Sequence, residues 1–203
     1  MCGDDAVSEV IGFSLILVMI ILALGIWAVH TAPQFTEDLE RTQNENILRQ
    51  FAAFKYDLDS FLAAGNTGVY GRKIFTYASG KHPSSIFIFS RPLHGRFSME
   101  RGHPAFQIDG TAYYPLVFTY RSANRYAENI VLELRDGVFT ADPYGLTLSG
   151  YGNGNSAVHM VVSDSSFVPW VISGEEEVIV SYRLERILQS GSGIFCVFDF
   201  SMW

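Results

Sequence analysis

The chain has 203 residues, which suits one sizeable domain plus an anchor and leaves little room for two domains. Its formal net charge of −7 argues against a nucleic-acid partner, because such partners favour a basic surface, and its Lys and Arg residues are scattered singly. The two cysteines, Cys2 and Cys196, flank the hydrophobic segment on either side, so we expect no disulfide between them and predict Cys196 to be a small buried residue.

The hydrophobic segment runs over residues 10–29 without a single charge. At ~1.5 Å of rise per residue, a helix of this length spans about 30 Å, the thickness of the hydrocarbon core of a bilayer. The alternative is a buried core helix, but such helices rarely run this long without a polar face. The short polar start MCGDD lacks the basic region of a secretory signal peptide, so we predict a retained membrane anchor.

Beyond Pro33 the sequence becomes amphipathic. Apolar residues recur at spacings of three and four, which places them on one helical face: Ile47, Phe51, Phe54, Leu58, Phe61 and Leu62. The charged residues predicted to lie away from this face are Glu45, Arg49, Lys55, Asp57 and Asp59. Because Gly65 supplies a stop signal, we predict one long helix over residues 6–64, kinked at Pro33, with a break at Pro33 as the alternative.

From Val69 onward the hydrophobic period changes to two. The predicted strands cover residues 72–78, 85–90, 113–121, 129–135, 146–149, 157–163, 177–187 and 194–201. Turn dipeptides such as Asp136-Gly137 and Ser173-Gly174 separate them. The sequence therefore predicts an α+β protein, in which a long hydrophobic and then amphipathic N-terminal helix precedes an antiparallel, β-rich, sandwich-like domain over residues 65–203.

The stretch D-D-A-V-S-E-V-I-G, residues 4–12, leads directly into the apolar helix and resembles the start of archaeal type IV pilins and pilin-like proteins, which carry a class III signal peptide. The resemblance implies that a leader peptidase removes residues 1–5 by cutting between Asp5 and Ala6, or alternatively just before Asp5. It further implies that the matured helices leave the membrane and bundle into a filament core, with the β-rich domains displayed outside.

Glu9 lies one turn beyond Ala6. We predict that its carboxylate neutralises the free amine of a processed chain, its own or a neighbour's, while the alternative is a first-turn acid in the lipid headgroup layer. Gly12, Ser14 and Gly25 are small residues that let helices approach closely, although they form no G-x-x-x-G motif.

No spacing of histidines, cysteines or acids matches a catalytic, cofactor or metal motif, so we predict no enzyme, cofactor or metal. The expected function is that of a major or minor subunit of an archaeal surface filament that supports adhesion. Its expected partners are other copies or related pilins, the leader peptidase and membrane lipid. Two alternatives stay open: a single-pass anchored ectodomain that binds a ligand, and an anchored enzyme whose site includes His94 or His159.

Overall fold

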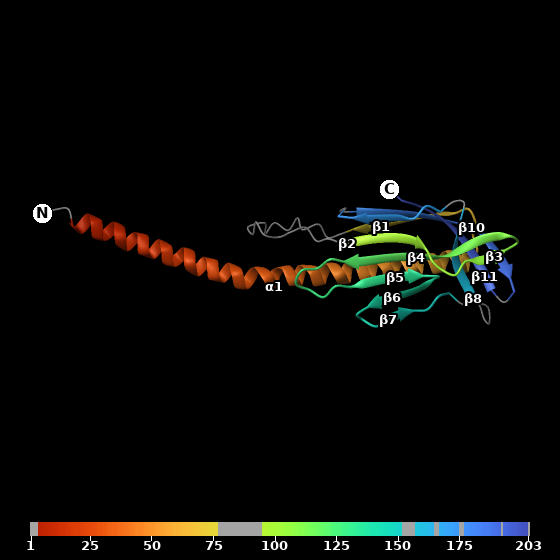
Figure 1. The fold of residues 1–203 in the computed structure, drawn as a ribbon, viewed down its shortest axis with the longest axis horizontal. Helices are drawn as coiled ribbons and strands as arrows, with labels where there is room; N and C mark the ends of the chain where they lie inside the picture. The colour runs from red at the N-terminus through yellow and green to blue at the C-terminus, as the bar shows by residue number, and fades with distance from the viewer. Residues whose placement is uncertain are drawn as a thin grey trace.

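The computed structural model describes residues 4–76, 95–151, 157–164, 167–174, 177–191 and 193–202. One long helix precedes a strongly curled, mostly antiparallel β domain, as the sequence predicts (Figure 1). The helix is α1 (Asp4–Ala64), and the strands are β1 (Tyr70–Thr76), β2 (Gly95–Arg101), β3 (Phe106–Ile108), β4 (Thr111–Ser122), β5 (Val131–Arg135), β6 (Val138–Asp142), β7 (Leu146–Leu148), β8 (Ala157–Ser163), β9 (Trp170–Ser173), β10 (Glu177–Ser190) and β11 (Gly193–Met202).

Helix α1 stays continuous through Pro33, so the predicted alternative of a break there is wrong. The helix ends where the sequence places the stop. Gly65 adopts a left-handed φ of 62°, and its backbone N–H donates to the carbonyls of Phe61 and Leu62 at 3.1 and 3.2 Å. Glycine reaches this conformation without a steric penalty, which makes it the common residue just after a helix.

The predicted apolar face of α1 forms the centre of the main core. Ile47, Phe51, Phe54, Leu58 and Leu62 are all buried against the curled sheet. The Phe51 ring is surrounded by aromatic rings from several strands, with centroid distances between 4.8 and 6.4 Å: Phe75, Phe97, Phe118, Tyr120 and Phe139. The second half of α1 is therefore an integral part of the β domain, and burial of this face fixes the helix to the sheet.

Lys55 contradicts the predicted charged face. Its side chain is 1% exposed and forms an ion pair with Asp59, one turn further on. Position 55 lies four residues after Phe51 and three before Leu58, so helical geometry directs it toward the same buried face. The neighbouring carboxylate offsets the desolvation of the ammonium group. By contrast, Glu45 and Arg49 are exposed as predicted.

The sheet has the strand order β1-β10-β11-β8-β4-β5-β6-β7, and β2 joins β4 to β9. Strand β4 connects two halves of this sheet, because Tyr113 to Pro115 pair with β8 whereas Val117 to Arg121 pair with β5. β11 and β8 form the parallel pair within an otherwise antiparallel ladder. This change of partners along β4 lets the sheet curl around one side of α1 (Figure 1).

The carboxylate of Asp136 connects the turn between β5 and β6 to strand β8, close to the place where β4 changes its pairing partner. Its Oδ1 accepts a hydrogen bond from the Met160 backbone N–H at 2.9 Å, and its Oδ2 lies 2.7 Å from His159 Nδ1. Burial raises the pKa of Asp136 above its ordinary value, although His159 and the Met160 N–H oppose this rise. Asp136 and Gly137 both have left-handed φ angles, 49° and 79°, so the predicted turn is confirmed as the tight hairpin between β5 and β6.

The sequence analysis missed β2, β3, β6 and β9, and the predicted strand over residues 85–90 lies outside the described residues. Strands β3 and β9 are short, and β6 follows the Asp136-Gly137 turn so closely that we did not separate it from β5. The alternation is nevertheless present in β2, where Phe97 and Met99 are buried between exposed Arg96 and Glu100.

We expect the fold to lose stability in alkali because of buried acids in the β domain. Burial raises the pKa of the Cys196 thiol to about 11 and, together with Asp57, raises the pKa of Tyr182 to about 12. The folded chain holds these protons after the unfolded chain has released them. The stability that Cys196 contributes is therefore complete below pH 9 and is lost as pH rises through about 11.

Each pH unit between these limits corresponds to about 1.4 kcal/mol for one group, so Cys196 alone accounts for roughly 2–3 kcal/mol. Urea unfolding of the detergent-solubilised chain from pH 8 to 11 measures this loss. The Cys196→Ala variant, although less stable at pH 8, is expected to lose less stability over the same range. An equal pH dependence in both chains would contradict the assignment.

Candidate functional site

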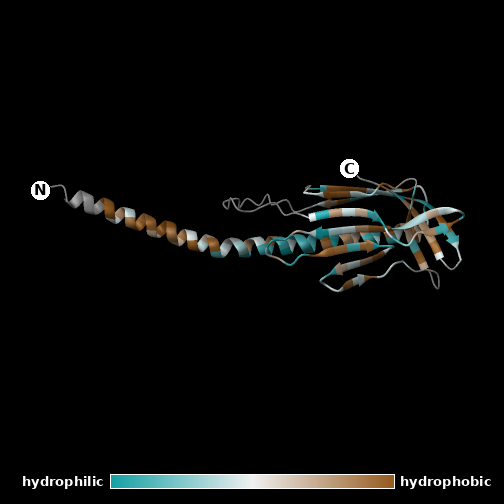
Figure 2. Cartoon of the chain, in the orientation of Figure 1, coloured by the Kyte–Doolittle hydropathy of each residue, from teal (hydrophilic) through white to brown (hydrophobic). Residues whose placement is uncertain are grey.

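The first half of α1 projects from the β domain as a bare apolar rod. Figure 2 shows the hydrophobic colour continuing around the projecting helix and giving way to hydrophilic residues before the β domain begins. No part of the apolar stretch is buried by the described chain, and even its largest side chain, Trp27, is 54% exposed. By length and composition, this helix can cross a membrane.

A short polar stretch separates the apolar rod from the β domain. The last residue of the rod is Val29, and the first buried helix residue of the domain is Glu40. Eleven residues of helix cover roughly 16 Å, and the interfacial layer of one leaflet is only about 5–8 Å thick. When the rod lies in hydrocarbon, the first contact between α1 and the described part of the β domain, at Glu40, therefore lies beyond the lipid headgroups.

The predicted processing and pairing residues lie in the first turns of α1. Asp5, Ala6 and Glu9 belong to its described backbone, while residues 1–3 lie outside the described residues. Glu9 is one helical turn from Ala6, a spacing that suits contact with the amine of a processed chain. Cleavage and this pairing stay predictions.

The three predicted helix-packing residues do not share one face. At 100° per residue, Ser14 and Gly25 lie about 20° apart around the helix, whereas Gly12 lies roughly 140° away from Gly25. A Cβ atom added at either glycine would meet no atom within 4 Å other than those of its own stretch of helix. The Ser14 hydroxyl donates to the Val10 carbonyl at 2.8 Å, so it needs no water in an apolar environment.

Sequence analysis missed the polar residues that lock α1 to the β domain. The Glu40 carboxylate, 4% exposed as a residue, accepts hydrogen bonds from three successive backbone N–H groups, those of Arg125, Tyr126 and Ala127, at 2.7–2.9 Å. One turn further on, the side chain of Asn44 donates to the Glu128 carbonyl at 3.0 Å. The available signal was the position of Glu40 and Asn44 in line with the apolar face.

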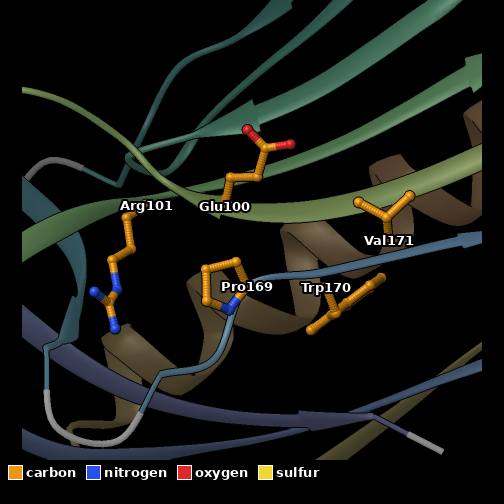
Figure 3. Close-up of a pocket in the computed structure, with 5 residues that line it drawn as sticks. All are labelled: Glu100, Arg101, Pro169, Trp170 and Val171. Carbon is orange, nitrogen blue, oxygen red and sulfur yellow. The ribbon is translucent and has the colours of Figure 1, made fainter.

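A surface hollow at the ends of β2 and β9 is lined by Glu100, Arg101, Pro169, Trp170 and Val171. Figure 3 shows Glu100 and Arg101 pointing to opposite sides of β2. Arg101 is already committed to Asp164, at 2.5 Å, and to the carbonyl of Phe167, at 2.6 Å. Because its charged groups diverge, the hollow presents no converging set of ligands.

The residues considered for an enzyme or a metal site have structural contacts or are not described. His159 bonds to Asp136, and its ring lies 4.9 Å from that of Phe195, while His94 lies outside the described residues. Among the side chains that the structure describes, no three His, Cys, Asp or Glu residues are grouped to hold a metal ion. Comparisons with protein-family models, curated proteins and solved structures return no match.

Proposed function

We propose that this chain is a structural subunit, major or minor, of an archaeal type IV pilus-like surface filament that supports adhesion or surface contact. The observation that carries the proposal is the single helix α1, apolar and exposed on every side over residues 10–29 and built into the β domain in its second half. Such a rod must be covered by lipid or by other helices, since water does not tolerate so large an apolar surface.

The sequence at the start of α1 favours other helices, rather than lipid, as the final environment of the apolar rod. Residues 4–12 resemble the processing region of archaeal pilins, in which removal of the leader frees the helix for assembly. In this proposal the chain first lies in the membrane through residues 10–29, and it then enters a filament with its β domain outside. Its partners are other copies or related pilins, the leader peptidase and membrane lipid.

The second candidate is a single-pass anchored ectodomain that binds a ligand or a partner and never assembles. The same rod favours it, because an all-round apolar surface fits lipid as well as a helical bundle. The polar stretch between the rod and the first contact of α1 with the β domain suits either arrangement.

The N-terminal residue of the native, membrane-extracted protein separates the two candidates. Intact mass and terminal peptide sequencing are expected to show a chain that begins at Ala6, or at Asp5 if the cut lies one residue earlier. An intact Met1 or Cys2 would instead mean that the helix is a permanent anchor. As a control, the Ala6→Trp variant, with a bulky residue at the cut, is expected to accumulate the unprocessed chain.

A further inference from the structure

The second half of α1 has one face that the described strands leave uncovered. The sheet buries the side of the helix that carries Ile47, Phe54 and Leu58. The opposite side carries a row of exposed residues, which we name the open stripe: Asp38, Arg41, Thr42, Glu45, Arg49, Tyr56, Ser60 and Ala63. At 100° per residue, these positions occupy a sector about 100° wide, centred opposite the buried face. A neighbouring chain can therefore reach α1 along this sector.

The N-terminal part of the open stripe belongs to a regular ladder of alternating charge. Glu37, Arg41, Glu45 and Arg49 follow one another at four-residue steps, so the signs alternate along one ridge of the helix. Within the chain, Arg41 pairs with Glu37 at 2.6 Å and Arg49 with Glu45 at 3.5 Å. Both arginine side chains stay largely exposed, at 67% and 77%, and can also contact a second chain.

Such a ladder is complementary to itself only at certain offsets. Two parallel copies in register would place Arg41 against Arg41 and Glu45 against Glu45, which is repulsive. A shift of four residues, about 6 Å along the axis, places Arg41 against Glu37 or Glu45 of the other copy, and every contact becomes attractive. A shift of eight residues restores like charges, so the pattern distinguishes neighbouring offsets.

The apolar half of the helix cannot make this distinction. Residues 10–29 carry no charge, and apolar contacts lack direction, so two rods can slide past each other at little cost. In coiled coils, charged positions beside an apolar seam select partner and register in this way. The open stripe begins at Asp38, nine residues beyond the end of the rod on the same continuous helix, so both segments can contact the same neighbour.

We propose that the open stripe docks against the open stripe of a second, parallel copy of this chain, shifted by about four residues, and so sets the axial offset between neighbours. The inference rests on the proposed function in that it requires the rods of two copies to lie side by side.

Disulfide cross-linking of the full chain in its native membranes and filaments tests the offset. In a Cys2→Ser background, copies carrying Asp38→Cys are co-expressed with copies carrying Thr42→Cys. Cys196 is buried and does not compete. We expect the mixed 38–42 dimer to form at least about fivefold more than the 38–38 or 42–42 dimer after correction for expression. Equal yields, or an excess of the like dimers, would overturn the proposal.

Charge reversal tests the cause of the offset. The double change Arg41→Glu with Arg49→Glu makes the ladder uniformly negative and is expected to reduce the mixed dimer at least about fivefold. The fully inverted ladder, with Glu37→Arg and Glu45→Arg added, is expected to restore it. Arg72→Glu, at an exposed position of β1 outside the stripe, is the matched control and should change nothing. Circular dichroism of each variant establishes that the domain is folded.

Electron microscopy of the same preparations separates this inference from the proposed function. Offset dimers in a membrane preparation that never yields filaments would support docking between open stripes and would contradict the filament proposal. Filaments whose copies cross-link in register, or whose cross-linking yield does not change on charge reversal, would contradict docking between open stripes and leave the filament proposal intact.

Discussion

Replacing Glu40 by alanine is expected to lower the free energy of unfolding of the β domain by about 3–5 kcal/mol. The carboxylate is buried and accepts three backbone hydrogen bonds from the loop between β4 and β5. Hydrogen bonds to a charged acceptor are stronger than neutral ones, and each N–H left unpaired in a buried site adds a desolvation penalty of about 1–3 kcal/mol. The loss therefore exceeds that of an ordinary surface contact several times over.

Urea unfolding of the full chain in a mild detergent, followed by tryptophan fluorescence, measures this change. The Glu40→Gln variant keeps one carbonyl oxygen in place and is expected to lose about half as much stability. Glu45→Ala, a nearby exposed acid on the same helix, serves as the control and should change stability by less than about 0.5 kcal/mol. A loss at Glu40 no larger than the control's would show that the loop does not depend on this carboxylate.

Hydrophobic periodicity was sufficient to predict the architecture. The spacing of Phe51, Phe54 and Leu58 identified the buried face of the helix, and the change to period two after Val69 identified the β domain. Both patterns are local consequences of how side chains project from helices and strands. Strand order could not be predicted from the sequence. For example, β1 pairs with β10, more than a hundred residues away, and this pairing depends on which surfaces fit together in three dimensions.

The errors at charged residues share one cause. We assigned Lys55 to the exposed face because of its charge, although its position relative to Phe51 and Leu58 places it inside. Glu40 and Asn44 are polar too, so a pattern of apolar residues does not assign them to the buried face. A polar residue in line with an apolar face indicates a buried partner, but the partners of these two residues lie more than 80 residues away in sequence. Only the fold brings these groups together.

The sequence placed the candidate site on the apolar helix but could not define its surface. Residues 10–29 are hydrophobic on every side, so their pattern contains no preferred direction, and the small residues Gly12 and Gly25 fall on different faces. The charged ladder that begins at Glu37 was readable from the sequence. Its exposure was not, because that depends on which side of α1 the sheet covers.

An arginine at the centre of the apolar rod is expected to weaken membrane insertion strongly, together with any assembly that follows. Exchanging Ile20 for arginine changes the insertion free energy of a transmembrane helix by about 3–4 kcal/mol, which corresponds to a decrease of roughly a hundredfold or more. The fraction of the chain that resists carbonate extraction from membranes measures this effect. Ile20→Leu should behave as the parent chain, and His30→Arg should be tolerated because an arginine at the end of the span reaches the headgroups.

The Gly25→Leu variant distinguishes a rod that is surrounded by lipid from a rod that is packed against neighbouring helices. Lipid accommodates a larger apolar side chain, and the described chain leaves the space around Gly25 empty, so membrane insertion should be unchanged or slightly improved. In a packed bundle of rods, the added side chain forces neighbouring helices apart wherever Gly25 lies at a contact. We therefore expect normal insertion with reduced filament yield. Normal insertion with an unchanged yield would mean that Gly25 faces no neighbouring helix, and packing would then have to be sought on the face that carries Gly12.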